Sequence, residues 1–174
     1  LPGSPTQAIE LSLPEMLSIQ EHFSTHQFVI AGLSSHNELY GRFLKDANTG
    51  IVYNKTYELL HYADAALVTS GTSTLETALF NVPQVVCYKT SAFNYYVGSC
   101  IVNVTYFSLV NLIMNKTVVK ELLQFNLAPK MQEELQRILT DVAYRNNMLN
   151  EYKKRRDLMV SLVLSFAWSF PESI

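Results

Sequence analysis

The stretch Ser70-Gly71-Thr72-Ser73-Thr74 joins one glycine to four hydroxyl side chains, a composition suited to binding an anion. It follows a short apolar run at residues 66–69, which predicts a buried strand, and a helical pattern begins directly after it. Such a strand–turn–helix junction directs free backbone N–H groups and the positive end of the helix dipole at one point, which binds phosphate. Gly71 allows close approach of the backbone, and the hydroxyls add further donors.

Glu76 lies in the first turns of the same predicted helix, and two roles are open to it. A carboxylate there can accept hydrogen bonds from a ribose diol, as the acidic residue of dinucleotide-binding folds does. Alternatively, it completes a capping box, in which a Ser or Thr cap is followed three residues later by Glu, whose side chain returns to the cap N–H. The spacing satisfies both roles.

An α/β fold would position this junction, because short apolar runs alternate with longer helical patterns. The alternation predicts βαβ units around a parallel sheet flanked by helices, with strands that are buried on both faces. The predicted strands are residues 28–32, 51–53, 66–69 and 84–88, and the predicted helices are residues 12–23, 37–45, 56–62 and 74–80. Asn81, followed by Val82-Pro83, ends the last of these helices.

Beyond Tyr88 the pattern is mostly helical. Thr140-Asp141 provides a cap between two predicted helices. The first helix is amphipathic and carries Met131, Leu135, Ile138, Leu139 and Val142 on one face. The chain begins with turn residues, Leu1-Pro2-Gly3-Ser4, that no strand precedes, and we expect a fragment of a longer polypeptide.

Composition narrows the function classes. The 174 residues are 48% hydrophobic and 16% charged, enough apolar material for one core, which excludes disordered and fibrous chains. A net charge of −2 gives no broad basic surface, so we expect no nucleic-acid partner. His22 and His26 lie four residues apart but no third ligand accompanies them at a recognisable spacing, so no metal is expected.

Two segments, residues 69–79 and 82–89, resemble the signature block of the bacterial lipid-A-disaccharide synthase family. Four shorter segments resemble other motifs of that family and follow in the same order: residues 1–4, 57–60, 108–112 and 119–124. The resemblance runs from residue 1 to about residue 150.

The resemblance implies the carboxyl-terminal, donor-binding half of a GT-B glycosyltransferase, with a Rossmann-like domain at residues 1–150 and a helical tail at residues 151–174. The family transfers diacylglucosamine from a UDP donor to diacylglucosamine 1-phosphate with inversion. The products are the β-1,6-linked disaccharide of lipid A and UDP. We expect no cofactor, a cytoplasmic location at the inner-membrane surface, and an isolated chain that is inactive because the family's catalytic base lies in the other domain.

Site residues also follow from the resemblance. Ser70, Gly71 and Thr72 would hold the diphosphate, and Glu76 the ribose. Asn111 would be the catalytically important polar group near the donor. The remaining nucleotide-binding residues would be Gly3, Ser4, Thr74 and Gln124.

Two positions depart from the family pattern. Pro5 stands where the family has an arginine, and Ala8 where it has an acidic residue. An arginine guanidinium at position 5 would donate two hydrogen bonds to a phosphate, and proline cannot. We therefore expect weaker binding of the UDP-sugar donor. Two alternative functions stay open: another UDP-sugar enzyme of GT-B architecture, and a non-catalytic nucleotide- or membrane-binding module.

The tail also has two interpretations. A basic cluster at residues 153–156 precedes an apolar run at residues 158–168, a pattern that can lie in a membrane interface. The same segment could instead be a terminal helix packed on the protein core. A homodimer is also among the predicted partners.

Overall fold

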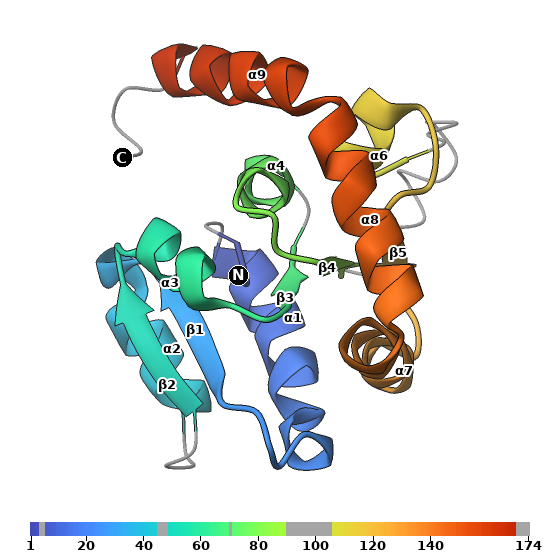
Figure 1. The fold of residues 1–174 in the computed structure, drawn as a ribbon. Helices are drawn as coiled ribbons and strands as arrows, with labels where there is room; N and C mark the ends of the chain where they lie inside the picture. The colour runs from blue at the N-terminus through green and yellow to red at the C-terminus, as the bar shows by residue number, and fades with distance from the viewer. Residues whose placement is uncertain (4–5, 45–48, 70, 90–105, 170–174) are drawn as a thin grey trace.

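Parallel strands form the sheets of this protein. The structure is a computed structural model that describes residues 1–3, 6–44, 49–69, 71–89 and 106–169, and for residues 166–169 it describes the backbone alone. Two sheets lie side by side in this part of the chain (Figure 1). The first pairs β1 (Phe28–Gly32) with β2 (Thr49–Tyr53), and the second has the order β3 (Ala66–Val68), β4 (Gln84–Tyr88), β5 (Lys120–Leu123). Every pairing is parallel, which confirms the predicted α/β class and suits one Rossmann-like half of a GT-B fold.

Helices flank both sheets. In chain order they are α1 (Thr6–Ser18), α2 (Asn37–Phe43), α3 (Thr56–Tyr62), α4 (Thr72–Leu79), α6 (Leu109–Met114), α7 (Leu127–Thr140), α8 (Val142–Lys154) and α9 (Arg156–Ser169), with short 3-10 turns at Gln20–His22 and Ser34–His36. Asn81 adopts a left-handed φ of 60° just after α4, so the predicted end of that helix is confirmed. The Asp141 cap is confirmed as well, because its carboxylate accepts the Tyr144 N–H at 2.9 Å.

Two expectations about elements were wrong. The first helix begins at Thr6 rather than at residue 12, and Pro14 lies well inside it although proline is typical of a first helical turn. Burial of Ile9, Leu13 and Met16 on one face stabilises the longer helix. The strand β5 was not predicted, because Lys120–Leu123 is a four-residue segment whose pairing with β4 is set by tertiary contacts.

The main core surrounds β4. Val85, Val86 and Cys87 are buried there, and side chains from α4, α6, α7 and α8 pack against them. A smaller cluster of Ile9, Leu13, Ile30, Leu39 and Tyr40 fills the space between α1, β1 and α2. The fold therefore has a large core under one sheet and a small one under the other.

The carboxyl-terminal helices join the main core. Met148 and Tyr152 of α8 and Met159 of α9 are almost completely buried, and α9 lies across α4 (Figure 1). The Arg156 guanidinium donates to the Leu79 carbonyl at 2.9 Å. The predicted boundary after residue 150 falls inside α8, and the division into two domains stays a prediction.

Candidate functional site at the strand ends

The turn between β3 and α4 has the conformation that an anion site needs. Gly71 caps α4 with φ 115° and ψ −160°, a region that residues with a Cβ avoid. A Cβ built on Gly71 would meet no atom within 4 Å, so its conformation rather than crowding requires glycine. Thr72 and Ser73, the first residues of α4 after this glycine, are half-buried.

Hydroxyl groups within α4 hold this turn together. The Thr74 hydroxyl donates to the Gly71 carbonyl at 2.8 Å, and the Thr74 side chain is completely buried. One turn further along, the Thr77 hydroxyl donates to the Ser73 carbonyl at 2.7 Å. Thr74 thus braces the loop from inside, while Ser70 lies outside the described residues.

A second turn lies directly beside the first. Leu1 and Gly3 lead into α1, and the Thr69 N–H donates to the Leu1 carbonyl at 3.0 Å. Gly3 has φ 87°, and a Cβ there would come within 2.6 Å of the Thr69 hydroxyl oxygen. The Gly3 turn and the Gly71 turn are therefore in contact through Thr69, whereas Ser4 and Pro5 lie outside the described residues.

Glu76 faces Tyr57 of α3. Its carboxylate accepts the Tyr57 hydroxyl at 3.3 Å, and the Tyr57 ring stacks on Phe80 with centroids 5.4 Å apart. Burial raises the pKa of Glu76, and the Tyr57 hydrogen bond opposes part of that shift. The capping-box alternative is wrong, because the cap is Gly71 and α4 has no side-chain cap hydrogen bond. Sequence reasoning gave no role to Tyr57, which only the packing of α3 on α4 brings to Glu76.

Gln124 lies at the same edge of the second sheet. Its N–H donates to the carbonyl of Tyr88, the last residue of β4, at 3.0 Å, and its φ of 56° turns the chain away from β5. Because β3, β4 and β5 are parallel, their carboxyl ends meet at one edge. Gly3, Gly71, Thr72 and Gln124 therefore share the edge where open α/β sheets bind ligands.

Asn111 is placed differently. It is buried in α6, where its side-chain oxygen accepts the N–H groups of Val118 and Val119 at 2.7 and 2.9 Å. Its amide nitrogen donates to the Val119 carbonyl and to Glu121, both at 2.8 Å. Glu121 in turn accepts the N–H and hydroxyl of Ser108, which caps α6. The side chain of Asn111 thus ties α6 to β5, and its contact with a donor stays a prediction.

The histidine pair does not form a cluster. His22 ends a 3-10 turn and His26 lies beyond it, where its ring nitrogen Nδ1 is 3.0 Å from the Thr25 hydroxyl. Over the part of the chain that the structure describes, no group of three or more His, Cys, Asp or Glu side chains is placed to hold a metal. No helix in that part is both long and apolar enough to span a membrane.

Comparison with known proteins identifies one family to which this chain is similar. The family model of lipid-A-disaccharide synthetase matches residues 1–163. A lipid-A-disaccharide synthase from Syntrophus aciditrophicus is 34% identical over 169 residues, and one from Myxococcus xanthus is 35% identical over 164; each alignment covers 90% of this chain and 43% of the relative. A third, from Colwellia psychrerythraea, is 40% identical over 94 residues, which is 54% of this chain and 24% of the relative. The chain spans less than half the length of these relatives.

Proposed function

This chain belongs to the lipid-A-disaccharide synthetase family, and from that premise we propose that it binds the UDP-sugar donor for lipid A disaccharide synthesis. The enzyme of which it forms part would be an inverting glycosyltransferase. It would move diacylglucosamine from UDP to diacylglucosamine 1-phosphate. One observation carries the proposal: the turn at Gly3, which leads into α1, and the strand–turn–helix junction at Gly71 lie in contact at the carboxyl edge of parallel strands.

The diphosphate is assigned to the open end of α4. Backbone N–H groups at Thr72 and Ser73 have no earlier helical carbonyl to bond, and the helix dipole adds positive potential there. These amides would also stabilise the UDP leaving group as negative charge develops on it, without a metal ion. Gly71 permits the approach, since it has no side chain and no atom other than those of its chain neighbours lies within 4 Å of the place a Cβ would take.

The ribose is assigned to Glu76. Its carboxylate already accepts a hydroxyl, that of Tyr57, at 3.3 Å, which is a weak contact that a sugar hydroxyl could replace. Glu76 lies one turn beyond Thr72 on α4, so ribose and diphosphate would bind along the same helix. The raised pKa of Glu76 means that ribose binding should strengthen with pH, as the carboxylate ionises.

Transfer with inversion needs a general base to deprotonate the acceptor hydroxyl. By resemblance, that base belongs to the part of the relatives that this chain does not cover. We therefore expect this chain to bind UDP without turning over substrate. Another GT-B enzyme of UDP-sugars would bind UDP equally, and the family membership favours the lipid A reaction over it.

The test is isothermal titration with UDP of the unmodified chain and two matched variants, Gly71→Ala and Gly41→Ala. Both added methyl groups meet no atom within 4 Å, but only Gly71 has a left-handed φ. The alanine variant should relax away from this φ, and restoring the turn on binding should cost about 1–3 kcal/mol, so UDP binding should weaken by about tenfold or more. Gly41→Ala should leave UDP binding unchanged. No binding by the unmodified chain at millimolar UDP, or equal binding by all three, would contradict the proposal.

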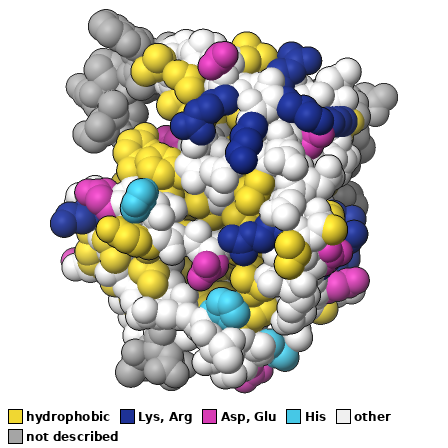
Figure 2. Space-filling model, in the orientation of Figure 1, with side chains coloured by type: hydrophobic (Ala, Val, Ile, Leu, Met, Phe, Trp, Pro, Cys, Tyr) yellow, Lys and Arg dark blue, Asp and Glu magenta, His cyan; other side chains and the backbone are white. Residues whose placement is uncertain are grey.

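A membrane contact is favoured by the surface of α8 and α9. Lys153, Lys154, Arg155 and Arg156 precede side chains that are partly exposed although apolar, at Leu158, Val160 and Leu164. Figure 2 shows dark-blue side chains gathered in the upper part of the face, where α8 and α9 lie, with yellow ones nearby. Met159 is buried against the core, so one side of α9 packs on the protein and another side faces solvent.

We place that exposed side against anionic lipid at the cytoplasmic face of the inner membrane, where acylated substrates would be found. Sedimentation with vesicles tests it through Lys153→Glu and a control charge reversal, Lys55→Glu, at an exposed position in α3's cap. Only Lys153→Glu should release the chain from anionic vesicles. Equal binding to neutral vesicles would contradict the proposal. A homodimer formed through the same helices stays a prediction, and the mass of the chain measured by sedimentation without lipid tests it.

A further inference from the structure

Gln84, the first residue of β4, carries an amide side chain that lies between α4 and α8. The residue is completely buried, and its side chain bonds to one residue of each helix. Among the described residues, its amide oxygen has no hydrogen-bond partner. A buried acceptor without a partner is destabilising, and a methionine of similar length would avoid that loss. The amide therefore needs a role that an apolar side chain cannot fill.

The nitrogen of this amide is bonded to the first turn of α4. It donates to the Thr74 carbonyl at 2.9 Å. A carbonyl oxygen only accepts, so the nitrogen of the amide rather than its oxygen must face Thr74. Thr74 is joined to Gly71 twice, because its N–H and its hydroxyl both donate to the Gly71 carbonyl, at 3.2 and 2.8 Å. These hydrogen bonds connect β4, through Thr74, to the turn at Gly71.

Tyr152 of α8 holds the amide from the other side. Its hydroxyl accepts a second hydrogen bond from the Gln84 nitrogen at 3.4 Å, which is longer and therefore weaker than the first. Burial raises the pKa of Tyr152, so the hydroxyl stays neutral. The helix α8 packs beside α4 (Figure 1). The two hydrogens of the amide are therefore directed at α4 and at α8.

These bonds set the direction of the free N–H groups at the start of α4. The Thr74 N–H is used by the Gly71 carbonyl, whereas the N–H groups of Thr72 and Ser73 have no helical carbonyl before them. Donors that are already arranged bind an anion more tightly than donors that must be ordered on binding. Holding Thr74 against β4 keeps Gly71 at its φ of 115°, and with it the two free N–H groups.

We propose that Gln84 is a positioning residue for the diphosphate: it holds Thr74, and through Thr74 the Gly71 turn, in the geometry that binds the donor. Tyr152 in turn orients Gln84. This inference rests on the proposed donor site at Gly71 and adds to it two residues that do not touch the nucleotide. It also explains why an amide stands at this position although its oxygen has no partner.

Two substitutions and one matched control test this. Gln84→Met removes the amide and keeps the length of the side chain, and Tyr152→Phe removes a single hydroxyl. Tyr144→Phe is the control, because it also deletes a hydroxyl from α8, but one that donates to Glu134 of α7. UDP affinity is measured by isothermal titration, and amide hydrogen exchange is measured without UDP.

Gln84→Met should weaken UDP binding about tenfold and Tyr152→Phe about threefold, because the turn must then be ordered on binding. Tyr144→Phe should leave UDP affinity unchanged. Without UDP, Gln84→Met should speed exchange of the Thr74 N–H about tenfold. Exchange of the Leu13 N–H, inside α1, should stay the same, since a positioning role does not alter the whole fold.

Equal acceleration at Thr74 and Leu13 would show a general loss of stability, and unchanged exchange at Thr74 would show that Gln84 does not hold the turn. Either result overturns the proposal, as does an equal loss of UDP affinity in Tyr144→Phe. If Gln84→Met does not fold, Tyr152→Phe gives the same two measurements. If the unmodified chain does not bind UDP, the proposed function fails, and the exchange of Thr74 still decides whether Gln84 holds the turn.

Discussion

The β3–β4–β5 sheet and the β1–β2 pair are both parallel and both flanked by helices, but their burial differs. Four of the five residues of β4 are buried, whereas every residue of β2 is only half-buried. The cluster around β4 draws on α4, α6, α7, α8 and α9, and the cluster beside β1 has five buried members. The difference teaches that the β3–β4–β5 sheet carries the stability on which the strand-end site depends, while the β1–β2 pair has only the smaller cluster packed against it.

Replacing one buried leucine by alanine in each region should give the largest difference between the two regions in the free energy of unfolding. Leu75 in α4 is completely buried, and Leu39 in α2 is 7% exposed at the smaller cluster. We expect Leu75→Ala to lower the free energy of unfolding by about 4–5 kcal/mol and Leu39→Ala by about 2–3, because the cavity at Leu39 can relax. Urea unfolding measures both. Equal losses would remove the proposed difference between the regions.

Asn111 tests whether the α6–β5 contact belongs to the stable region. Asn111→Ala leaves the N–H groups of Val118 and Val119 without their acceptor, so the free energy of unfolding should fall by about 2–4 kcal/mol. UDP affinity of the chain that remains folded should change little. A large loss of UDP affinity at unchanged stability would instead show that Asn111 reaches the donor.

Glu76 gives the smallest expected effect. Because its folded pKa is raised above 4.5, the folded state holds more protons just above that pH, and stability falls as pH rises through this window. Glu76→Gln should remove that decline, because the amide does not titrate. It should also weaken UDP binding about tenfold through the lost charged hydrogen bond. Unchanged affinity in calorimetry would argue against a ribose contact.

Local signals made parts of the fold predictable. The left-handed Asn81 after α4 and the Asp141 cap of α8 depend on residues within a few positions, so the sequence carries them directly. The junction at Gly71 was predictable for the same reason, because a glycine between an apolar strand and a helix is typical of a turn that needs a positive φ.

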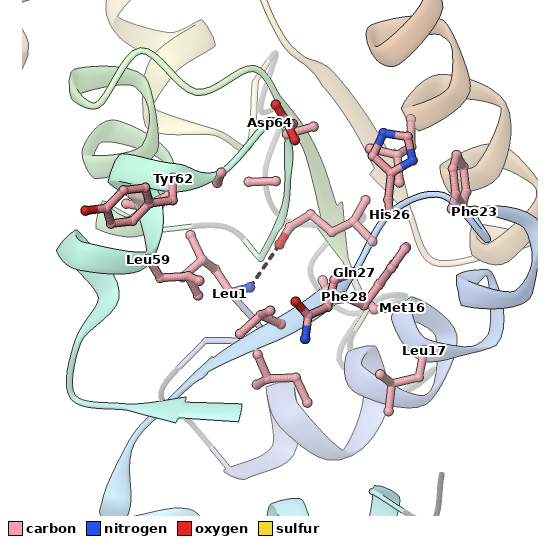
Figure 3. A pocket seen from close by; sticks show the side chains of 18 of the residues that line it. Leu1, Met16, Leu17, Phe23, His26, Gln27, Phe28, Leu59, Tyr62 and Asp64 are labelled. Atoms are coloured by element: carbon pink, nitrogen blue, oxygen red, sulfur yellow. Dashed lines mark hydrogen bonds between the residues drawn. The ribbon is translucent and has the colours of Figure 1, made fainter. Parts of the chain in front are cut away.

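Other features depend on residues that are distant in sequence. The strand β5 exists because β4 offers it an edge, and its four residues have no distinctive pattern of their own. Tyr57 reaches Glu76 only through the packing of α3 on α4, and Asn111 is buried only because residues 118–121 return to α6. The pocket lined by Val29 and Ile30 of β1 and by Ala66 and Leu67 of β3 (Figure 3) is likewise a property of the assembled sheets, because its walls come from distant parts of the sequence.

The central claim is that UDP binds at the carboxyl edge of β3, β4 and β5, and amide hydrogen exchange with and without saturating UDP tests it most directly. The account predicts slower exchange at Thr72, Ser73 and Gln124, with no change at β1 and β2. Protection confined to the β1–β2 pair or to α9, or no protection anywhere in the chain at saturation, would contradict it.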